Sequence, residues 1–175
     1  MAPLPAATRL PTPLNESVRG LRTSLEVIFP ERHVAIVLTS SEPGEGKTFV
    51  SANLAVAMAR AGRSVILAEA DLRRPRVRTY FDLPEGSPGF AELVESDAAT
   101  DEIESALIDT PYRGLRVLPA GTSDAEPADL LAGDTLDGVL TRLRGLADFV
   151  LLDSPPGLAL ADAASQQTGV LVAPP

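Results

Sequence analysis

The sequence contains no cysteine and no tryptophan, and it has a single histidine. The lack of cysteine excludes a disulfide framework and any metal or catalytic site made of thiolates. No apolar run approaches the ~18 residues of a membrane-spanning helix, and no signal peptide is evident. Basic residues are also few, and the net charge of −9 argues against sequence-independent binding of nucleic acid. We therefore expect a cytoplasmic domain with an aliphatic core, since 45% of the residues are hydrophobic and few of these are aromatic.

The strongest local pattern lies in residues 33–61. An apolar run ends at Leu38, a loop with two glycines follows, and Gly46-Lys47-Thr48 leads into helix-forming residues up to Ala61. Glycines let the backbone turn successive N–H groups toward an anion, and a helix N-terminus adds the positive end of its dipole. Lysine can then reach a nucleotide's β- and γ-phosphates, and threonine can bind Mg²⁺. The pattern predicts a nucleotide-binding loop that comprises Gly44, Glu45, Gly46, Lys47, Thr48 and Phe49.

Short apolar runs and amphipathic stretches alternate along the rest of the chain. Strands are predicted at 64–68, 115–118, 149–153 and 169–172, and helices at 16–29, 135–146 and 160–167, while 103–108 fits either. A strand, a helix and a strand in succession from residue 33 predict parallel strands joined by a crossover. We expect an α/β P-loop NTPase fold, with a mostly parallel central sheet and helices on both faces. The proline-rich residues 1–14 are expected to be a flexible leader, followed by one domain at 15–175.

Acidic residues follow two of the predicted strands. Glu69 and Asp71 come after the strand 64–68, and Asp153 ends the apolar run that begins at Phe149. In open α/β sheets, ligands bind outside the carboxyl ends of the strands, so these carboxylates should face the phosphate-binding loop. We predict that Thr48, Asp71 and Asp153 hold Mg²⁺, with Lys47, Glu69, Asp71 and Asp153 as the candidate catalytic residues.

A second pattern of charges lies on the predicted helix 16–29. Glu16, Arg19 and Arg22 recur at i, i+3 and i+6, away from the apolar stripe of the same helix. On pattern alone, the simplest interpretation is a solvated face with one weak ion pair.

Taken together, these motifs resemble the bacterial tyrosine kinases of capsule and exopolysaccharide export. The segments TSSEPGEGKT, VILAEADLRRP and VLLDSPP are similar to the Walker A, Walker A′ and Walker B motifs of that family, in the same order. The resemblance implies an ATP- and Mg²⁺-dependent protein-tyrosine kinase that regulates capsular or exopolysaccharide biosynthesis and export. It also implies that Glu16, Arg19 and Arg22, which match the family's E-x-x-R-x-x-R helix, mediate assembly into a homo-oligomeric ring.

Further partners are implied by the same resemblance. They are protein tyrosine substrates and a membrane activator protein of the polysaccharide co-polymerase type, which would hold the chain at the inner face of the cell membrane. No nucleic-acid partner is expected.

Two departures from the family pattern are visible. The first acidic residue of Walker A′, which the family is thought to use as the base toward the tyrosine hydroxyl, is usually aspartate, and here it is Glu69. The family also continues into a tyrosine-rich tail, so we expect this chain to be short at its C-terminus.

Two alternative functions remain open. One is a MinD/ParA-type ATPase, although Glu42 stands where those proteins carry a lysine early in the loop. The other is a degenerate regulatory subunit that binds nucleotide without transferring phosphate.

Overall fold

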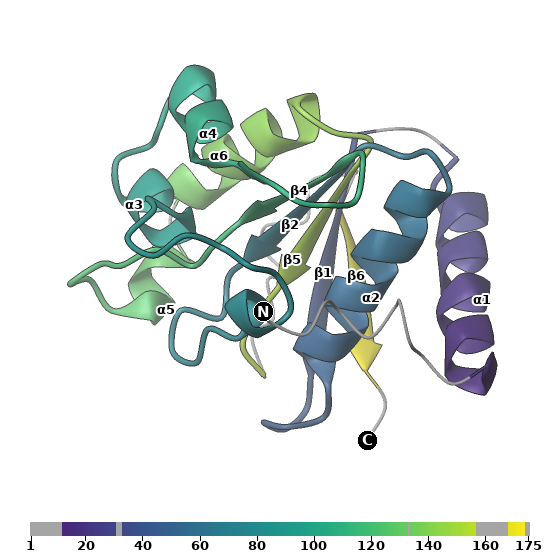
Figure 1. Ribbon diagram of the computed structural model, residues 1–175. Helices are drawn as coiled ribbons and strands as arrows, with labels where there is room; N and C mark the ends of the chain where they lie inside the picture. The colour runs from purple at the N-terminus through teal and green to yellow at the C-terminus, as the bar shows by residue number, and fades with distance from the viewer. Residues whose placement is uncertain (1–11, 31–32, 133, 157–167, 174–175) are drawn as a thin grey trace.

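The fold is a six-stranded sheet between helices (Figure 1). The computed structural model describes residues 12–30, 33–132, 134–156 and 168–173. The strands are β1 (Val34–Ser40), β2 (Val65–Glu69), β3 (Ile108–Asp109), β4 (Leu115–Leu118), β5 (Phe149–Asp153) and β6 (Thr168–Ala173). Their order is β3-β4-β2-β5-β1-β6, and every pair is parallel except β3 with β4. The predicted α/β fold with a mostly parallel sheet is therefore confirmed.

Helices cover both faces of the sheet. They are α1 (Thr12–Ile28), α2 (Lys47–Arg60), α3 (Phe90–Glu95), α4 (Thr100–Ala106), α5 (Pro127–Leu130) and α6 (Asp134–Gly145), with a short 3₁₀ helix, η2 (Val77–Thr79). Successive side chains of a strand point to opposite faces. In β1, Val34 and Ile36 pack in the cluster that contains α2, whereas Ala35 and Val37 pack in the cluster that contains α3, α4 and α6. Burial on both faces explains why these strands are uninterrupted apolar runs in the sequence.

The N-terminal helix begins earlier than predicted. α1 starts at Thr12, so residues 12–14, which we assigned to the flexible leader, are helical. Pro13 is compatible with this start because proline is tolerated in the first turn of a helix, where its missing N–H has no partner to lose. Val18 and Leu25 are buried, and α1 packs alongside α2 (Figure 1). Residues 1–11 of the leader lie outside the described residues.

Three further sequence predictions need comment. The ambiguous segment 103–108 is the end of α4 followed by the first residue of the short edge strand β3. The helix predicted at 160–167 lies outside the described residues. Among the helices that the structure does describe, none combines the length and the apolar character needed to cross a membrane.

Candidate nucleotide-binding site

The carboxyl ends of three strands meet at one edge of the sheet. In the register of the sheet, Asp153 of β5 is aligned with Leu38 of β1 on one side and with Glu69 of β2 on the other. The loop after β1 leads directly into α2, so a helix N-terminus lies at the same edge. A cavity of about 460 Å³ opens there. It is lined by Pro43, Gly44, Gly46, Lys47, Thr48, Phe49, Asp71, Arg73, Arg74, Arg76, Tyr80, Pro155 and Pro156.

The loop between β1 and α2 has the backbone conformation that its glycines permit. Gly44 and Gly46 have φ angles of 90° and 84°, in the left-handed region that residues with a Cβ rarely adopt. Gly46 is the N-cap of α2 and offers no side chain to the first N–H groups of the helix. Glu45 does not line the cavity; its Oε2 accepts the Glu42 N–H at 3.1 Å and so braces the loop. The loop therefore presents backbone N–H groups and a helix dipole to an anion.

Lys47, the first residue of α2, lies in the wall of the cavity. It is 7% exposed, and its Nζ donates to Ser40 Oγ at 2.8 Å. The Ser40 hydroxyl in turn donates to the Glu42 carbonyl at 2.8 Å, which ties the start of the loop to the end of β1. The Lys47 ammonium can replace its hydrogen bond to the neutral Ser40 hydroxyl with one to a charged phosphate oxygen. That hydrogen bond is stronger because both partners are charged.

Asp153 is a buried carboxylate whose two oxygens differ. Its Oδ1 lies 3.0 Å from the Ser51 hydroxyl, while its Oδ2 is buried and has no hydrogen-bond partner among the described residues. Burial raises the pKa of Asp153 to about 6. The Thr48 and Ser51 hydroxyls and the charge of Lys47 lower the pKa of Asp153, whereas the charge of Asp71 raises it further.

Asp71 lies beside Asp153 and reaches the cavity. Its backbone N–H donates to the Asp153 carbonyl at 2.9 Å, and its Oδ1 accepts the Arg74 N–H at 3.1 Å. These two carboxylates and the Thr48 hydroxyl are hard oxygen donors, the kind that Mg²⁺ prefers. No group of three or more acidic, histidine or cysteine ligands occurs in the described part of the chain. Mg²⁺ commonly uses one or two carboxylates and completes its shell with water and substrate phosphates. The unpartnered Asp153 Oδ2 is the best evidence that these residues fit Mg²⁺.

Glu69 is buried, and backbone N–H groups surround its carboxylate. The residue is 1% exposed, is absent from the cavity lining, and accepts backbone N–H groups of Arg76, Val77 and Ala120. Burial raises the pKa of the Glu69 carboxyl, with these three hydrogen bonds acting against it. The position predicted to supply the base is therefore enclosed by backbone in this structure.

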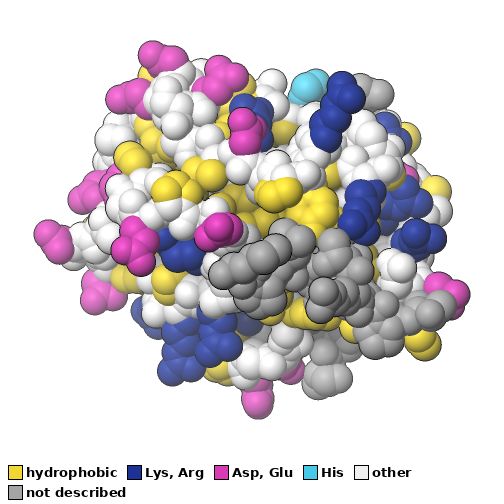
Figure 2. All heavy atoms as spheres, viewed as in Figure 1, with side chains coloured by type: hydrophobic (Ala, Val, Ile, Leu, Met, Phe, Trp, Pro, Cys, Tyr) yellow, Lys and Arg dark blue, Asp and Glu magenta, His cyan; other side chains and the backbone are white. Residues whose placement is uncertain are grey.

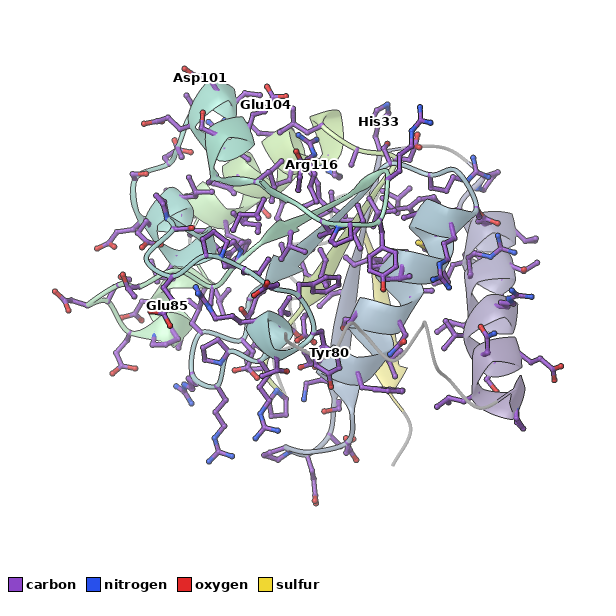
Figure 3. The ribbon with its side chains drawn as sticks, viewed as in Figure 1. His33, Tyr80, Glu85, Asp101, Glu104 and Arg116 are labelled. Atoms are coloured by element: carbon purple, nitrogen blue, oxygen red, sulfur yellow. The ribbon has the colours of Figure 1, made fainter. Side chains whose placement is uncertain are left out.

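Sequence reasoning missed Ser51, Arg76 and Tyr80 of this site. Ser51 could have been found, because it is four residues after Lys47 and so lies on the same face of α2. Arg73, Arg74 and Arg76 line the cavity, and Lys and Arg side chains gather at the lower left of Figure 2, where the loop after β2 lies in Figure 1. Tyr80 lies between η2 and the start of α2 (Figure 3). Burial raises the pKa of Tyr80, the charge of Asp153 raises it further, and Arg76 lowers it.

The three charged residues of α1 lie apart from this cavity. Glu16 and Arg19 are exposed, and Arg22 is half-buried, with its guanidinium 4.0 Å from the Glu26 carboxylate. Arg19 and Arg22 line a smaller cavity of about 200 Å³ between α1 and α2, together with Asn53 and Arg60. The Arg22 Nε is buried without a hydrogen-bond partner in the described part of the structure.

Comparison with known proteins supports a nucleotide-binding fold. Residues 36–119 match the CobQ/CobB/MinD/ParA nucleotide binding domain family. The chain is 34% identical over 158 residues to tyrosine-protein kinase ptk of Acinetobacter johnsonii, an alignment that covers 89% of this chain and 21% of the relative. It thus spans only about a fifth of the length of that relative.

Solved structures give the same result. The BceF tyrosine kinase domain superposes with a TM-score of 0.74 and 38% identity, covering 92% of this chain and 62% of that one. The septum site-determining protein MinD from Pyrococcus horikoshii, complexed with Mg-ADP, superposes with a TM-score of 0.63 and 29% identity, covering 80% and 57%. The chain therefore has the fold of the MinD/ParA-like P-loop nucleotide-binding domains, and in sequence and structure it is similar to bacterial tyrosine-kinase domains.

Proposed function

We propose that this chain is the ATP- and Mg²⁺-binding domain of a protein-tyrosine kinase. The observation that carries the proposal is the buried Asp153, whose unpartnered Oδ2 lies at the carboxyl edge of the sheet where the phosphate-binding loop begins. A buried carboxylate oxygen without a hydrogen-bond partner is costly, and such groups are characteristic of functional sites. The similarity to tyrosine-kinase domains supports phosphotransfer to tyrosine as the reaction.

In this proposal each residue of the site has a defined task. The glycine loop and Lys47 hold the β- and γ-phosphates of ATP, and Thr48, Asp71 and Asp153 hold Mg²⁺, which would neutralise charge on the phosphates. The phenolic oxygen of the substrate tyrosine attacks the γ-phosphorus, the bond from that phosphorus to the β,γ-bridging oxygen breaks, and ADP leaves. Asp71 is the acidic side chain that lines the cavity, so we assign to it the acceptance of the phenolic proton.

The wider role follows from the resemblance alone. We propose that the chain acts in capsular or exopolysaccharide biosynthesis, as a homo-oligomeric ring assembled through Glu16, Arg19 and Arg22. The exposure of Glu16 and Arg19 on an outer helix supports this assignment. We further propose a membrane activator protein as the partner that would hold the chain in the cytoplasm at the inner face of the membrane.

A MinD-type ATPase is the alternative that the fold favours, since MinD superposes on this chain. In that case water, rather than a tyrosine hydroxyl, would receive the phosphate. The exposed carboxylate of Glu42 speaks against it, because this position is a cation in the MinD/ParA pattern, and here the Glu42 N–H is engaged with Glu45.

The test measures where the γ-phosphate of labelled Mg·ATP goes, using a synthetic tyrosine peptide as acceptor. We expect label on the peptide with the native chain and none with Lys47→Met. Release of free phosphate without labelling of the peptide would contradict the kinase function and support the MinD-type ATPase. Absence of nucleotide binding, measured by calorimetry, would remove both functions.

A further inference from the structure

Glu69, the last residue of β2, makes an unusual set of contacts. Its Oε1 accepts the backbone N–H groups of Arg76 and Val77, the latter at 2.6 Å, and its Oε2 accepts the N–H of Ala120 at 3.2 Å. An ionised carboxylate only accepts hydrogen bonds, so three donors suit that form. A buried N–H group that loses its acceptor is destabilising, which makes each of these contacts important to the fold.

The donors come from two segments that are distant in the sequence. Arg76 and Val77 lie at the start of η2, and Val77 is completely buried in the core cluster that contains α2. Ala120 follows β4, and its carbonyl accepts the Ala91 N–H at 2.9 Å at the start of α3. One side chain thus connects the end of β2 to η2 and to the loop after β4.

This connection determines one wall of the nucleotide cavity. Arg76 and Tyr80, at the two ends of η2, both line the cavity, and Figure 3 shows Tyr80 directed toward the start of α2. The backbone that carries them is attached to the sheet through the Glu69 carboxylate. If that attachment is lost, the wall loses its fixed position although none of its own residues has changed.

The same contacts are unsuited to a proton acceptor. Backbone N–H groups already occupy three of the roughly four acceptor positions of the carboxylate, so a single position, on Oε2, is left for a proton. The length of the side chain also matters. Aspartate lacks one methylene and so ends about 1.5 Å earlier along the chain, which is too far to keep contacts with both segments in the present backbone.

We propose that Glu69 is a positioning residue, a carboxylate that fixes the Arg76–Tyr80 wall of the cavity to β2 and β4, and that it is not the base of the reaction. Its effect on phosphotransfer rests on the proposed kinase function. Its effects on folding and on nucleotide affinity do not, and they can be measured whether or not the chain transfers phosphate.

The test compares Glu69→Gln and Glu69→Asp with the native chain in three measurements. These are the melting temperature, amide hydrogen exchange at Arg76, Val77 and Ala120, and the affinity for an ATP analogue. In the native chain we expect all three amides to be protected. Gln keeps one acceptor oxygen but directs an NH₂ group at one segment, so protection should be lost there and the melting temperature should fall by roughly 3–10 °C. The Glu69→Asp variant should lose at least as much amide protection and have at least as large a fall in melting temperature. Both variants should bind the ATP analogue several-fold more weakly.

Glu92→Gln is the matched control. Glu92 also accepts backbone N–H groups from two segments, those of Gly89 at 3.0 Å and Thr122 at 2.9 Å, but neither of these two residues lines the cavity, whereas Arg76 does. This variant should lower the melting temperature while leaving analogue affinity unchanged. The proposal is overturned if Glu69→Gln keeps native stability and amide protection. It is equally overturned if Glu69→Asp transfers phosphate at the native rate while Glu69→Gln transfers none, because that pattern identifies a base.

Discussion

The Ser51 hydroxyl on α2 lies 3.0 Å from Asp153 Oδ1 on β5, so the helix that follows the phosphate-binding loop directly holds the carboxylate at the sheet's edge. Ser51 is itself completely buried and lies 2.9 Å from the Lys47 carbonyl. Helix, loop and carboxylate therefore form one connected unit. A change at any of these positions should be measurable at the others.

The first prediction concerns the cost of burying Asp153. Its pKa is raised from 3.8 to about 6 in the folded protein, so the native state binds this proton more tightly than the unfolded state. The free energy of unfolding should therefore fall as pH rises from about 4 to about 6.5, by on the order of 3 kcal/mol from this group. Asp153→Asn removes the charge and should make the nucleotide-free protein more stable than the native chain at pH 7.5, with a much smaller gain at pH 4.5.

Urea unfolding at the two pH values tests this prediction. The difference between native and variant isolates the single group, because all other titrating residues are shared. A stability difference that is the same at both pH values would contradict it. The same variant should lose Mg²⁺-dependent nucleotide binding, so that stability is gained where function is lost.

A second prediction follows from the opening contact. Ser51→Ala removes a hydroxyl that lowers the pKa of Asp153, so the pKa of Asp153 should rise and the protein should lose about 1–2 kcal/mol at neutral pH. Carboxyl ¹³C NMR titration would follow the pKa directly. Ser105→Ala is the control, because the exposed Ser105 hydroxyl of α4 donates to the backbone carbonyl four residues earlier, that of Asp101, as Ser51 does to Lys47, but it lies far from Asp153 in the sequence and on another helix. A titration of Asp153 that is unchanged in Ser51→Ala would refute the electrostatic role of the hydroxyl.

The third prediction concerns the backbone of the loop. Gly46 has a φ of 84°, and a Cβ built there would meet no atom within 4 Å, so Gly46→Ala introduces backbone strain without a clash. We expect a loss of about 1–2 kcal/mol, together with weaker nucleotide binding because the N–H groups at the start of α2 shift. Gly20→Ala is a control of opposite sign, since Gly20 is helical, equally uncrowded and has no positive φ. It should stabilise the protein by roughly 0.5–1 kcal/mol. Thermal unfolding of both variants would test this prediction, which is contradicted if Gly46→Ala is as stable as the native chain.

The sequence predicted the sheet well and the orientation of side chains at its edge less well. Strands such as Val34–Ser40 are recognisable because burial on both faces leaves an uninterrupted apolar run. Lys47 and Asp153 follow from the order of strand, loop and helix. Glu69 could not be placed in the same way, because its orientation depends on the Ala120 N–H, a group 51 residues away that carries no side-chain signal. Tyr80 was missed for a similar reason: the short η2 that brings it to the cavity has no periodic pattern.

The last prediction concerns the charged helix α1. If Arg19 binds a neighbouring copy of this chain, Arg19→Ala should lower the assembled mass in solution. Arg19 suits this test better than Arg22, because Arg19 is exposed, whereas Arg22 pairs with Glu26 within the same helix and its loss also affects the fold. Arg113→Ala, an exposed arginine on the loop before β4, is the control. Light scattering at low and high salt should show a smaller assembly only for Arg19→Ala, and the native assembly should weaken with salt because exposed charges are screened. An unaltered mass in Arg19→Ala would exclude this residue from the contact and leave the proposed ring without support from α1.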